Sequence, residues 1–238
     1  MKLTHIDLFS GIGGFSLAAD RVWGKENITH IFSDNEPFAQ EVIKKHWLHA
    51  PILVDIRSFT NTRIEKSRGL SSSEREALAS ARESGVFILT GGFPCQPFSQ
   101  AGRRRGEEDD RFLWPEMLRV IREFSPLWVI AENVRGLLTQ GGGVVFKRVC
   151  TDLEAAGYEV QPIIIPAVAV GAPHRRDRVW FVAHREDERR KWGRPARNRR
   201  AGFTHEPWRE HWLEVATRLC RVDDEFSYWV DGRGKKRN

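Results

Sequence analysis

The sequence is poor in cysteine and has no long apolar run. Its three cysteines, Cys95, Cys150 and Cys220, lie far apart, so their spacing indicates neither a disulfide framework nor a zinc site. No apolar stretch approaches the roughly 18 residues that span a bilayer, and the first residues lack the apolar region of a signal peptide. These absences argue against a disulfide-stapled secreted fold. They predict a cytoplasmic protein with no bound metal and no membrane partner.

The composition suits a globular protein with a modest basic excess. The 238 residues are 40% hydrophobic and 29% charged, and 38 lysines and arginines against 32 acids give a net charge of +6. That balance is compatible with a polyanionic partner but does not identify one. Arginines gather in residues 185–200, and five of the nine tryptophans lie from Trp180 onward, which suits nucleic-acid contact. On charge alone, a solvated face and tail is the simpler interpretation.

Short apolar runs alternate with helical patterns over most of the chain. Strands are predicted at residues 3–8, 29–33, 52–54, 86–90, 127–131, 158–165 and 179–183. Helices are predicted at residues 15–22, 36–47, 73–83, 113–123 and 144–156. This order predicts an α/β fold with a doubly wound, mostly parallel sheet, in which the last two strands could pair. We place a boundary near Ala183, so that residues 1–183 form one domain. Residues 184–238 form a small irregular region with one helix at 212–221.

The first predicted strand leads into a glycine-rich turn, residues 11–14. Glycines let the backbone approach a ligand, and the following helix N-terminus favours negative charge. A nicotinamide-cofactor fingerprint would require a third glycine where Ser16 stands, so that pattern is incomplete. Asp34 ends the second strand, where an acid can bind ribose hydroxyls, and Asp55 and Ile56 after the third strand could contact an adenine. The pattern predicts a nucleoside-containing cofactor, and a tight turn without a ligand is the alternative.

The fourth predicted strand leads into a loop that carries Cys95. In an open α/β sheet, ligands gather at the carboxyl ends of the strands, and Pro94 and Pro97 stiffen this loop. A thiolate at that place can act as a soft nucleophile. An inert, buried cysteine is the alternative.

Several segments, in order along the chain, resemble motifs of the DNA (cytosine-5) methyltransferase family, in particular its short phage and bacterial members. Residues 91–102, Gly-Gly-Phe-Pro-Cys-Gln-Pro-Phe-Ser-Gln-Ala-Gly, are similar to the catalytic loop of that family, and residues 7–17 to its S-adenosylmethionine-binding motif. Glu132-Asn133-Val134 matches its Glu-Asn-Val motif, and residues 171–178 resemble its Gln-x-Arg-x-Arg motif, with His174 in the glutamine place. The resemblance covers about residues 3–183. It implies a Rossmann-like methyltransferase fold, S-adenosylmethionine as cofactor and double-stranded DNA as partner.

The resemblance also implies how the reaction proceeds. Addition of the Cys95 thiolate to C6 of cytosine makes C5 nucleophilic toward a methyl sulfonium. Glu132 would hydrogen-bond or protonate N3, which requires a pKa raised by burial. Arg178 would hold O2, and Arg176 would support the site or meet a phosphate. Loss of the C5 proton then allows Cys95 to leave, and the cytosine must first be flipped out of the duplex.

Binding residues are carried over from the same motifs. The cofactor-binding residues expected from them are Phe9, Gly11, Ile12, Gly13, Gly14, Asp34, Asn35, Asp55, Ile56 and Pro94. The DNA-binding residues expected from the catalytic loop are Gln96, Ser99, Arg103 and Arg111. For residues 103–110 a self-compensating surface run is the alternative, because four acids follow three arginines.

The sequence departs from the family pattern at its C-terminal end. Family members carry a Gly-Asn-Ser/Ala-Val motif that completes the cofactor pocket, and these 238 residues do not contain it. We therefore expect residues 184–238 to be a reduced target-recognition region, which leaves open a truncated, catalytically weak remnant that binds DNA or cofactor without turnover.

Three further expectations complete the sequence interpretation. A tRNA methyltransferase of this fold would carry Cys-Phe-Thr, and the nearest match here, Gly202-Phe203-Thr204, lacks the cysteine. A nicotinamide oxidoreductase would leave the Cys95 loop unexplained. We expect a monomer, with a restriction endonuclease as a functional rather than a physical partner.

Overall fold

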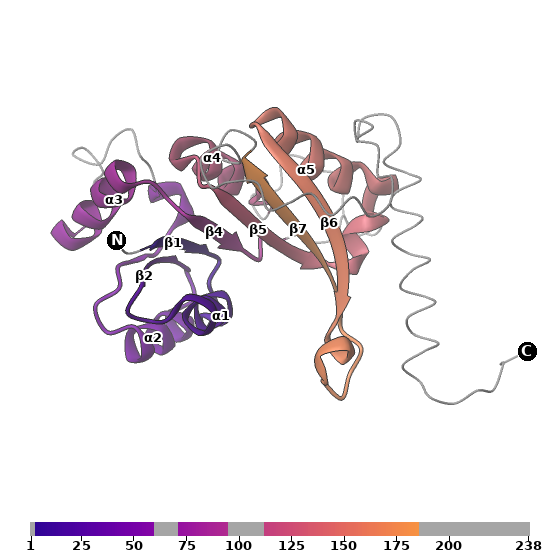
Figure 1. The fold of residues 1–238 in the computed structure, drawn as a ribbon. Helices are drawn as coiled ribbons and strands as arrows, with labels where there is room; N and C mark the ends of the chain where they lie inside the picture. The colour runs from indigo at the N-terminus through magenta and orange to yellow at the C-terminus, as the bar shows by residue number, and fades with distance from the viewer. Residues whose placement is uncertain (1–2, 60–70, 95–111, 186–238) are drawn as a thin grey trace, which may run out of the picture.

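The computed structural model describes residues 3–59, 71–94 and 112–185, which form a seven-stranded sheet with helices on both faces (Figure 1). The strands are β1 (Leu3–Leu8), β2 (Ile28–Ser33), β3 (Ile52–Leu53), β4 (Ile88–Gly91), β5 (Trp128–Val134), β6 (Tyr158–Pro166) and β7 (Asp177–Arg185). The α-helices are α1 (Gly14–Trp23), α2 (Pro37–His46), α3 (Ser72–Ser84), α4 (Trp114–Phe124) and α5 (Val144–Ala155). The short 3-10 helices are η1 (Ile56–Ser58), η2 (Arg135–Leu138), η3 (Gln140–Gly143) and η4 (Ala167–Val170).

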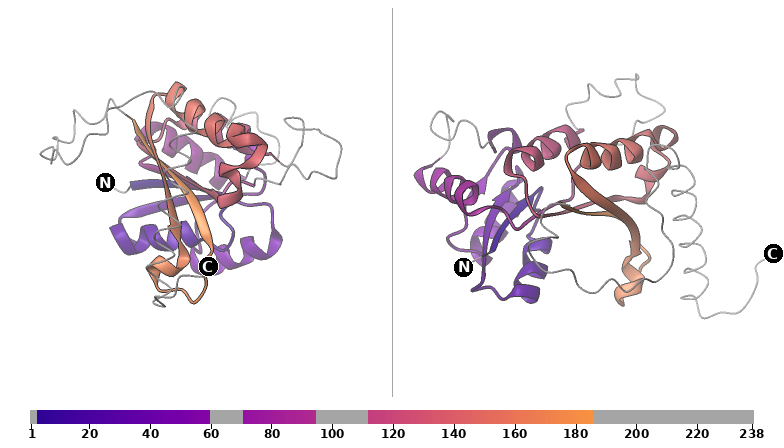
Figure 2. Two further views of the ribbon diagram at one scale, coloured as in Figure 1. Left: turned by 90° about the vertical axis from the view of Figure 1, so that its right-hand side faces the viewer. Right: turned by 45° about the horizontal axis from the view of Figure 1, so that its top comes forward.

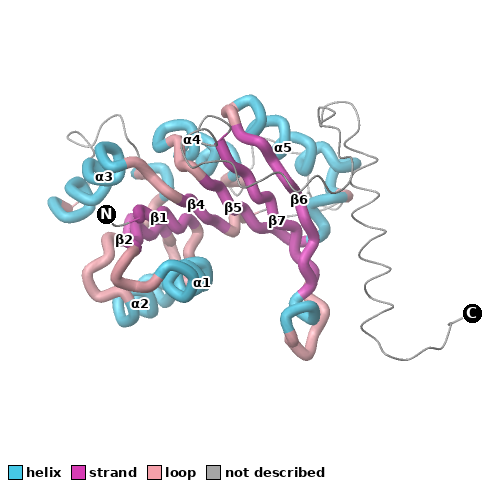
Figure 3. The backbone as a smooth tube through the Cα atoms, viewed as in Figure 1, coloured by secondary structure: helices cyan, strands magenta, loops and turns pink. Residues whose placement is uncertain are grey.

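The sheet has the order β3-β2-β1-β4-β5-β7-β6. Strands β1 to β5 pair in parallel, whereas β7 is antiparallel to both β5 and β6. Helices α3, α4 and α5 lie on one face and α1 and α2 on the other (Figure 3). The far end of the β6–β7 hairpin, with η4, extends beyond the body of the sheet (Figure 2). The predicted doubly wound fold and the pairing of its last two strands are confirmed.

Each face of the sheet has its own buried cluster. On one face, α4 presents a stripe of apolar side chains at helical spacing, among them Trp114, Met117 and Ile121, to a large core shared with α3 and α5. On the other face, Phe32, Ile43 and Trp47 form a smaller cluster between β2 and α2. None of the helices in these ranges is long and apolar enough to cross a membrane.

The structure corrects the predicted position of one motif. We expected Glu132-Asn133-Val134 after the fifth strand, but β5 continues through all three residues. The reason is long-range pairing, because Glu132 lies opposite Trp180 and Val134 opposite Arg178 on the antiparallel strand β7. Strand β7 is also longer than the predicted strand at residues 179–183, because it runs from Asp177 to Arg185. The predicted helix at 212–221, within residues 186–238, lies outside the described residues.

The topology brings two predicted motifs to one edge of the sheet. The strand order reverses between the neighbouring strands β1 and β4, and Leu8 at the end of β1 is in register with Gly91 at the end of β4. Ligand sites of open α/β sheets form at such switch points, outside the carboxyl ends of the strands. The glycine turn and the start of the Cys95 loop both leave the sheet here.

Candidate active site

The glycine turn is held in a conformation that depends on two of its glycines. Gly11 has a φ of +52° and Gly13 a φ of +83°, values that favour glycine. A Cβ on Gly13 would lie 2.6 Å from Cζ3 of the Trp47 ring, so a larger residue would displace that ring. The N–H of Gly11 donates to Oδ2 of Asp34 at 2.7 Å. The turn is therefore fixed both to the α2 side and to the end of β2.

The backbone next to the turn is also unusual. Phe9 has a φ of +53°, which is uncommon for a residue with a side chain. The Ser10 hydroxyl lies 2.7 Å from the carbonyl oxygen of Asp7 and 3.1 Å from that of Ser33, within donating distance of both. A residue with a side chain in this conformation, next to a glycine turn at a strand end, is typical of a functional constraint.

Ser16 explains why the glycine fingerprint is incomplete. Its side chain is buried in the first turn of α1, and its hydroxyl donates to Oδ2 of Asp7 at 2.7 Å. Burial raises the pKa of the Asp7 carboxyl to about 7. The position that holds a glycine in dinucleotide-binding turns thus anchors α1 to β1 through a hydrogen bond.

Asp34 is oriented by the backbone around it. Its Oδ1 accepts the N–H of Glu36 at 2.9 Å while Oδ2 accepts that of Gly11, so the half-buried carboxylate faces the turn. Asn35 beside it is exposed. A carboxylate held in this way at the end of β2 can accept hydrogen bonds from a ribose diol.

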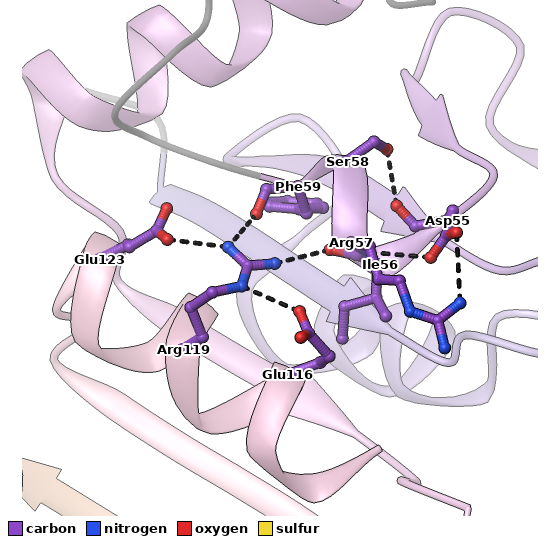
Figure 4. Close-up of polar contacts among 8 residues, drawn as sticks. All are labelled: Asp55, Ile56, Arg57, Ser58, Phe59, Glu116, Arg119 and Glu123. Atoms are coloured by element: carbon purple, nitrogen blue, oxygen red, sulfur yellow. Dashed lines mark hydrogen bonds and ion pairs between the residues drawn. The ribbon is translucent and has the colours of Figure 1, made fainter. Parts of the chain in front are cut away.

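The segment after β3 is fastened by a side chain that the sequence did not single out. Asp55 is exposed and caps η1 by accepting the N–H of Arg57, whereas Ile56 is 4% exposed and belongs to the core. Arg119 of α4 donates to the carbonyl oxygens of Ile56 and Phe59 (Figure 4). It also pairs with two acids of its own helix, Glu116 and Glu123, at 2.9 and 2.8 Å. One arginine therefore sets the position of the expected adenine contact.

The start of the cysteine loop is packed against both neighbouring strands. A Cβ on Gly91 would lie 3.0 Å from the carbonyl oxygen of Leu8, and one on Gly92 would lie 3.1 Å from Oε2 of Glu132. Asn133 donates from Nδ2 to the carbonyl oxygen of Phe93 at 2.8 Å. The backbone is thus fixed up to Pro94, which is half-buried. Cys95, Gln96, Ser99, Arg103 and Arg111 lie outside the described residues.

Glu132 and Arg178 form an ion pair at the same edge of the sheet. Nε of Arg178 lies 2.7 Å from Oε1 of Glu132, and both side chains are about one-fifth exposed, at 21% and 22%. Burial raises the pKa of Glu132 above its ordinary value, although Arg178 and Arg176 act in the opposite direction. A half-buried carboxyl with a raised pKa beside a cation is suited to donate a proton to a bound base.

Arg176 lies just before β7 and is exposed, with a φ of +41°. The adjacent carboxylate of Asp177 forms ion pairs with two other arginines, Arg175 at 2.9 Å and Arg135 at 3.4 Å. Of the two predicted arginines, only Arg178 contacts Glu132 directly, while Arg176 acts on it through charge.

The predicted residues that the structure describes lie along one edge of the sheet, at the carboxyl ends of β1 to β5 and at the start of the antiparallel strand β7. They provide an oriented carboxylate, an open glycine turn and a glutamate–arginine pair. Within residues 3–59, 71–94 and 112–185, no group of three or more His, Cys, Asp or Glu could hold a metal ion. The contacts of Arg119 and Ser16 depend on tertiary structure, so no local signal pointed to them.

Comparison with known proteins identifies a family whose model matches most of the chain. The family described as C-5 cytosine-specific DNA methylase matches residues 3–219. Among curated proteins, the chain is 31% identical over 193 residues to the type II methyltransferase M.BspRI of Lysinibacillus sphaericus, covering 78% of this chain and 45% of that protein. It is 34% identical over 183 residues to M1.ScrFI of Lactococcus lactis subsp. cremoris, covering 76% and 41%. The chain thus spans less than half the length of these relatives.

Solved structures agree in fold. A candidate DNA modification methyltransferase encoded within an E. coli prophage superposes with a TM-score of 0.60 and 25% identity, covering 78% of this chain and 47% of that one. The S. pombe Dnmt2 methyltransferase superposes with a TM-score of 0.54 and 21% identity, covering 83% and 57%.

Proposed function

Because this chain belongs to the C-5 cytosine-specific DNA methylase family, we propose that it transfers a methyl group from S-adenosylmethionine to C5 of a cytosine in double-stranded DNA. The observation that carries this proposal is the Glu132–Arg178 pair, which meets the backbone leading to Cys95. A glutamate with a raised pKa, an arginine and a cysteine are the groups that a covalent route through C6 of cytosine requires.

The described residues fit S-adenosylmethionine, which supplies an electrophilic methyl group when bound. The Asp34 carboxylate would accept hydrogen bonds from the ribose hydroxyls, with Asn35 beside it. A Cβ at Gly11 or Gly14 would meet nothing within 4 Å, so the turn presents open backbone to a ligand. Asp55, with the backbone of Ile56, would bound the adenine. The remainder of the proposed cofactor site would be lined by Phe9, Ile12, Gly13 and Pro94.

The chemistry starts with the cytosine. The Cys95 thiolate forms a bond to C6, and the electron pair moves toward N3, where the protonated Glu132 carboxyl donates. C5 is then nucleophilic and would take the methyl group from the sulfur of S-adenosylmethionine, which would leave as S-adenosylhomocysteine, while N3 returns its proton to Glu132. Removal of the C5 proton by a base, for which a water would serve, expels Cys95 and restores the aromatic ring.

The ion pair suggests how the protonation of Glu132 is controlled. With no base bound, Arg178 favours the ionised carboxyl and burial favours the neutral one. When a flipped cytosine offers its O2 to Arg178, the arginine shares its charge with the base and the carboxyl loses solvent. Both changes favour the protonated form of Glu132, so that the proton donor is prepared by substrate binding.

DNA contacts are proposed for the loop after Cys95. Arg103 and Arg111 would meet phosphates, and Gln96 and Ser99 would contact the nucleotides around the flipped base. Arg176, exposed at the start of β7, would serve a phosphate or support the site. We further propose that the protein acts in the cytoplasm as a monomer, with a restriction endonuclease as its functional counterpart.

Transfer of a labelled methyl group to mixed-sequence DNA tests this function. The wild type should transfer label, and Cys95→Ala should abolish transfer. Cys150→Ala, which removes a thiol buried in the core, is the matched control and should retain transfer. Transfer by Cys95→Ala at the wild-type rate would refute the covalent route. Cofactor binding without transfer by the wild type would instead support the binding-only alternative.

A further inference from the structure

Five polar side chains form a buried line across the sheet beneath the glycine turn. Oδ1 of Asp7 lies 2.9 Å from Oγ1 of Thr90, which lies 2.8 Å from Nε2 of His5. Nδ1 of His5 lies 2.9 Å from Nδ1 of His30, and Nε2 of His30 lies 2.8 Å from Oδ1 of Asp20. The first four residues are at most 4% exposed, and the Asp20 side chain is 11% exposed. We call these five residues the buried relay.

Strand register builds the relay. His5 and Asp7 alternate on β1 and so lie on one face, with His30 of β2 directly opposite His5 and Thr90 of β4 directly opposite Asp7. Asp20 comes from α1, which packs over the same face. Both nitrogens of both rings have a partner within 2.9 Å, so the number of contacts does not depend on the tautomer.

With both carboxylates ionised and both rings neutral, the relay has too few hydrogens to form all of its hydrogen bonds. Four contacts require four hydrogens. With both carboxylates ionised, Thr90 supplies one hydrogen and the neutral rings of His5 and His30 supply one each, which makes three. A contact without a hydrogen would set two lone pairs against each other in a buried place, at a cost comparable to a lost hydrogen bond. One further proton completes the line.

Two arrangements accommodate that proton. In one, Asp7 is protonated and donates to Thr90, and every donor then points toward Asp20. In the other, His30 is doubly protonated beside the Asp20 carboxylate, and His5 and Thr90 donate toward Asp7. Reversing the three hydrogen bonds between Asp7 and His30 converts one arrangement into the other, and in both of them His30 donates to Asp20.

We propose that the buried relay holds one shared proton at neutral pH, and that loss of this proton loosens the glycine turn. Each end of the relay is linked to the turn through one further residue. At one end, Oδ2 of Asp7 accepts the Ser16 hydroxyl just beyond the turn. At the other end, Oδ2 of Asp20 accepts Nε1–H of Trp47 at 3.0 Å, and the Trp47 ring packs against Gly13.

The electrostatic surroundings place release of the proton near neutrality. Burial raises the pKa of Asp7 to about 7, with a smaller contribution from the Asp34 carboxylate. Burial, with His30, lowers the pKa of His5 to about 3. Burial also lowers the pKa of His30, with Lys25 acting in the same direction and Asp20 opposing it. Ser16 and Trp47 add only neutral hydrogen bonds.

Nuclear magnetic resonance of protein labelled with 15N-histidine tests the shared proton. In the wild type, the ring signals of His5 and His30 should change together in one step between pH 6 and 8.5. Asp20→Asn and Asp7→Asn should each abolish the step, because the new amide donates where a proton was needed and its oxygen keeps the contact to Trp47 or Ser16. Separate midpoints for the two histidines in the wild type would overturn the proposal, as would an unchanged step in Asp20→Asn.

Amide hydrogen exchange tests the link to the turn without any ligand. The N–H of Gly13 donates to the carbonyl oxygen of Ser10 at 2.9 Å. At pH 8.5 it should exchange about three- to tenfold faster in the wild type than in Asp20→Asn, the equivalent of about one hydrogen bond. At pH 6 the two proteins should exchange alike. Equal rates at both pH values would refute the link.

A third measurement separates this inference from the proposed function, on which its consequence for the cofactor rests. The affinity of the wild type for S-adenosylhomocysteine should fall about three- to tenfold from pH 6.5 to 8.5, and that of Asp20→Asn should not. If neither protein binds this ligand at any pH, the proposed function fails, while the histidine step and the exchange rates still decide on the shared proton. Equal pH dependence of binding in the two proteins would refute the coupling to the cofactor.

Discussion

Substitution of Gly13 by alanine tests the geometry of the glycine turn. The positive φ of +83° disfavours any L-residue, at a cost of about 1–2 kcal/mol. The added Cβ would also lie 2.6 and 2.7 Å from two atoms of the Trp47 ring, which is 9% exposed and held by Asp20. Overpacking of this kind costs about 1–3 kcal/mol. We therefore expect the free energy of unfolding to fall by about 2–5 kcal/mol.

Gly157→Ala is the matched control. Its φ of +89° is nearly the same, but a Cβ there meets nothing within 4 Å. It should lose only the conformational component, about 1–2 kcal/mol. Urea unfolding followed by far-UV circular dichroism measures both variants without using tryptophan as the probe. Equal losses for the two substitutions would refute the contact between the turn and Trp47.

Three further changes test the rest of the site. Asn133→Asp removes the donor to the Phe93 carbonyl oxygen, so the free energy of unfolding should fall by about 1–3 kcal/mol at pH 7 in urea titration; an unchanged value would contradict a role in fixing the loop. Arg119→Lys cannot reproduce the planar set of contacts in Figure 4, and KM for S-adenosylmethionine should rise more than kcat falls; the opposite split would contradict a binding role. Arg178→Met removes the positive charge that most lowers the Glu132 pKa, while burial still raises that pKa. The pKa should therefore rise further, and the Glu132 carboxyl signal in carbon NMR should titrate at higher pH. A lower midpoint would refute the stated cause.

The order of strands and helices follows from local patterns. Alternating apolar runs and helical stripes mark the elements, α1 and α3 end at Gly24 and Gly85, and each expected element of the described ranges is present within a few residues. The part that failed is the end of β5, where Glu132 remains in the strand because β7 pairs with it. That partner lies more than forty residues further along the chain and runs antiparallel, so no local window contains it.

The site residues divide in the same way. Asp34 and Glu132 were predicted because their motifs are contiguous in sequence. Arg119 and the buried relay were not, because each depends on cross-strand register or on helix packing. His5 and Asp7 alternate within β1, next to the apolar residues Ile6 and Leu8, which was the one local signal for the relay. Buried polar side chains that alternate on one face of a strand require partners, and these come from segments far away in sequence.

Trapping of a covalent complex tests the proposed mechanism most directly. Fluorine at C5 of cytosine cannot leave as a proton does, so DNA containing 5-fluorocytosine should remain bonded to the enzyme after methyl transfer. With S-adenosylmethionine, the wild type should form an adduct stable to denaturant, and mass spectrometry should place it on Cys95. Cys95→Ala should form none, and Cys150→Ala should form it normally. Methyl transfer to ordinary DNA without any adduct on the fluorinated DNA, or an adduct on another residue, would contradict the account.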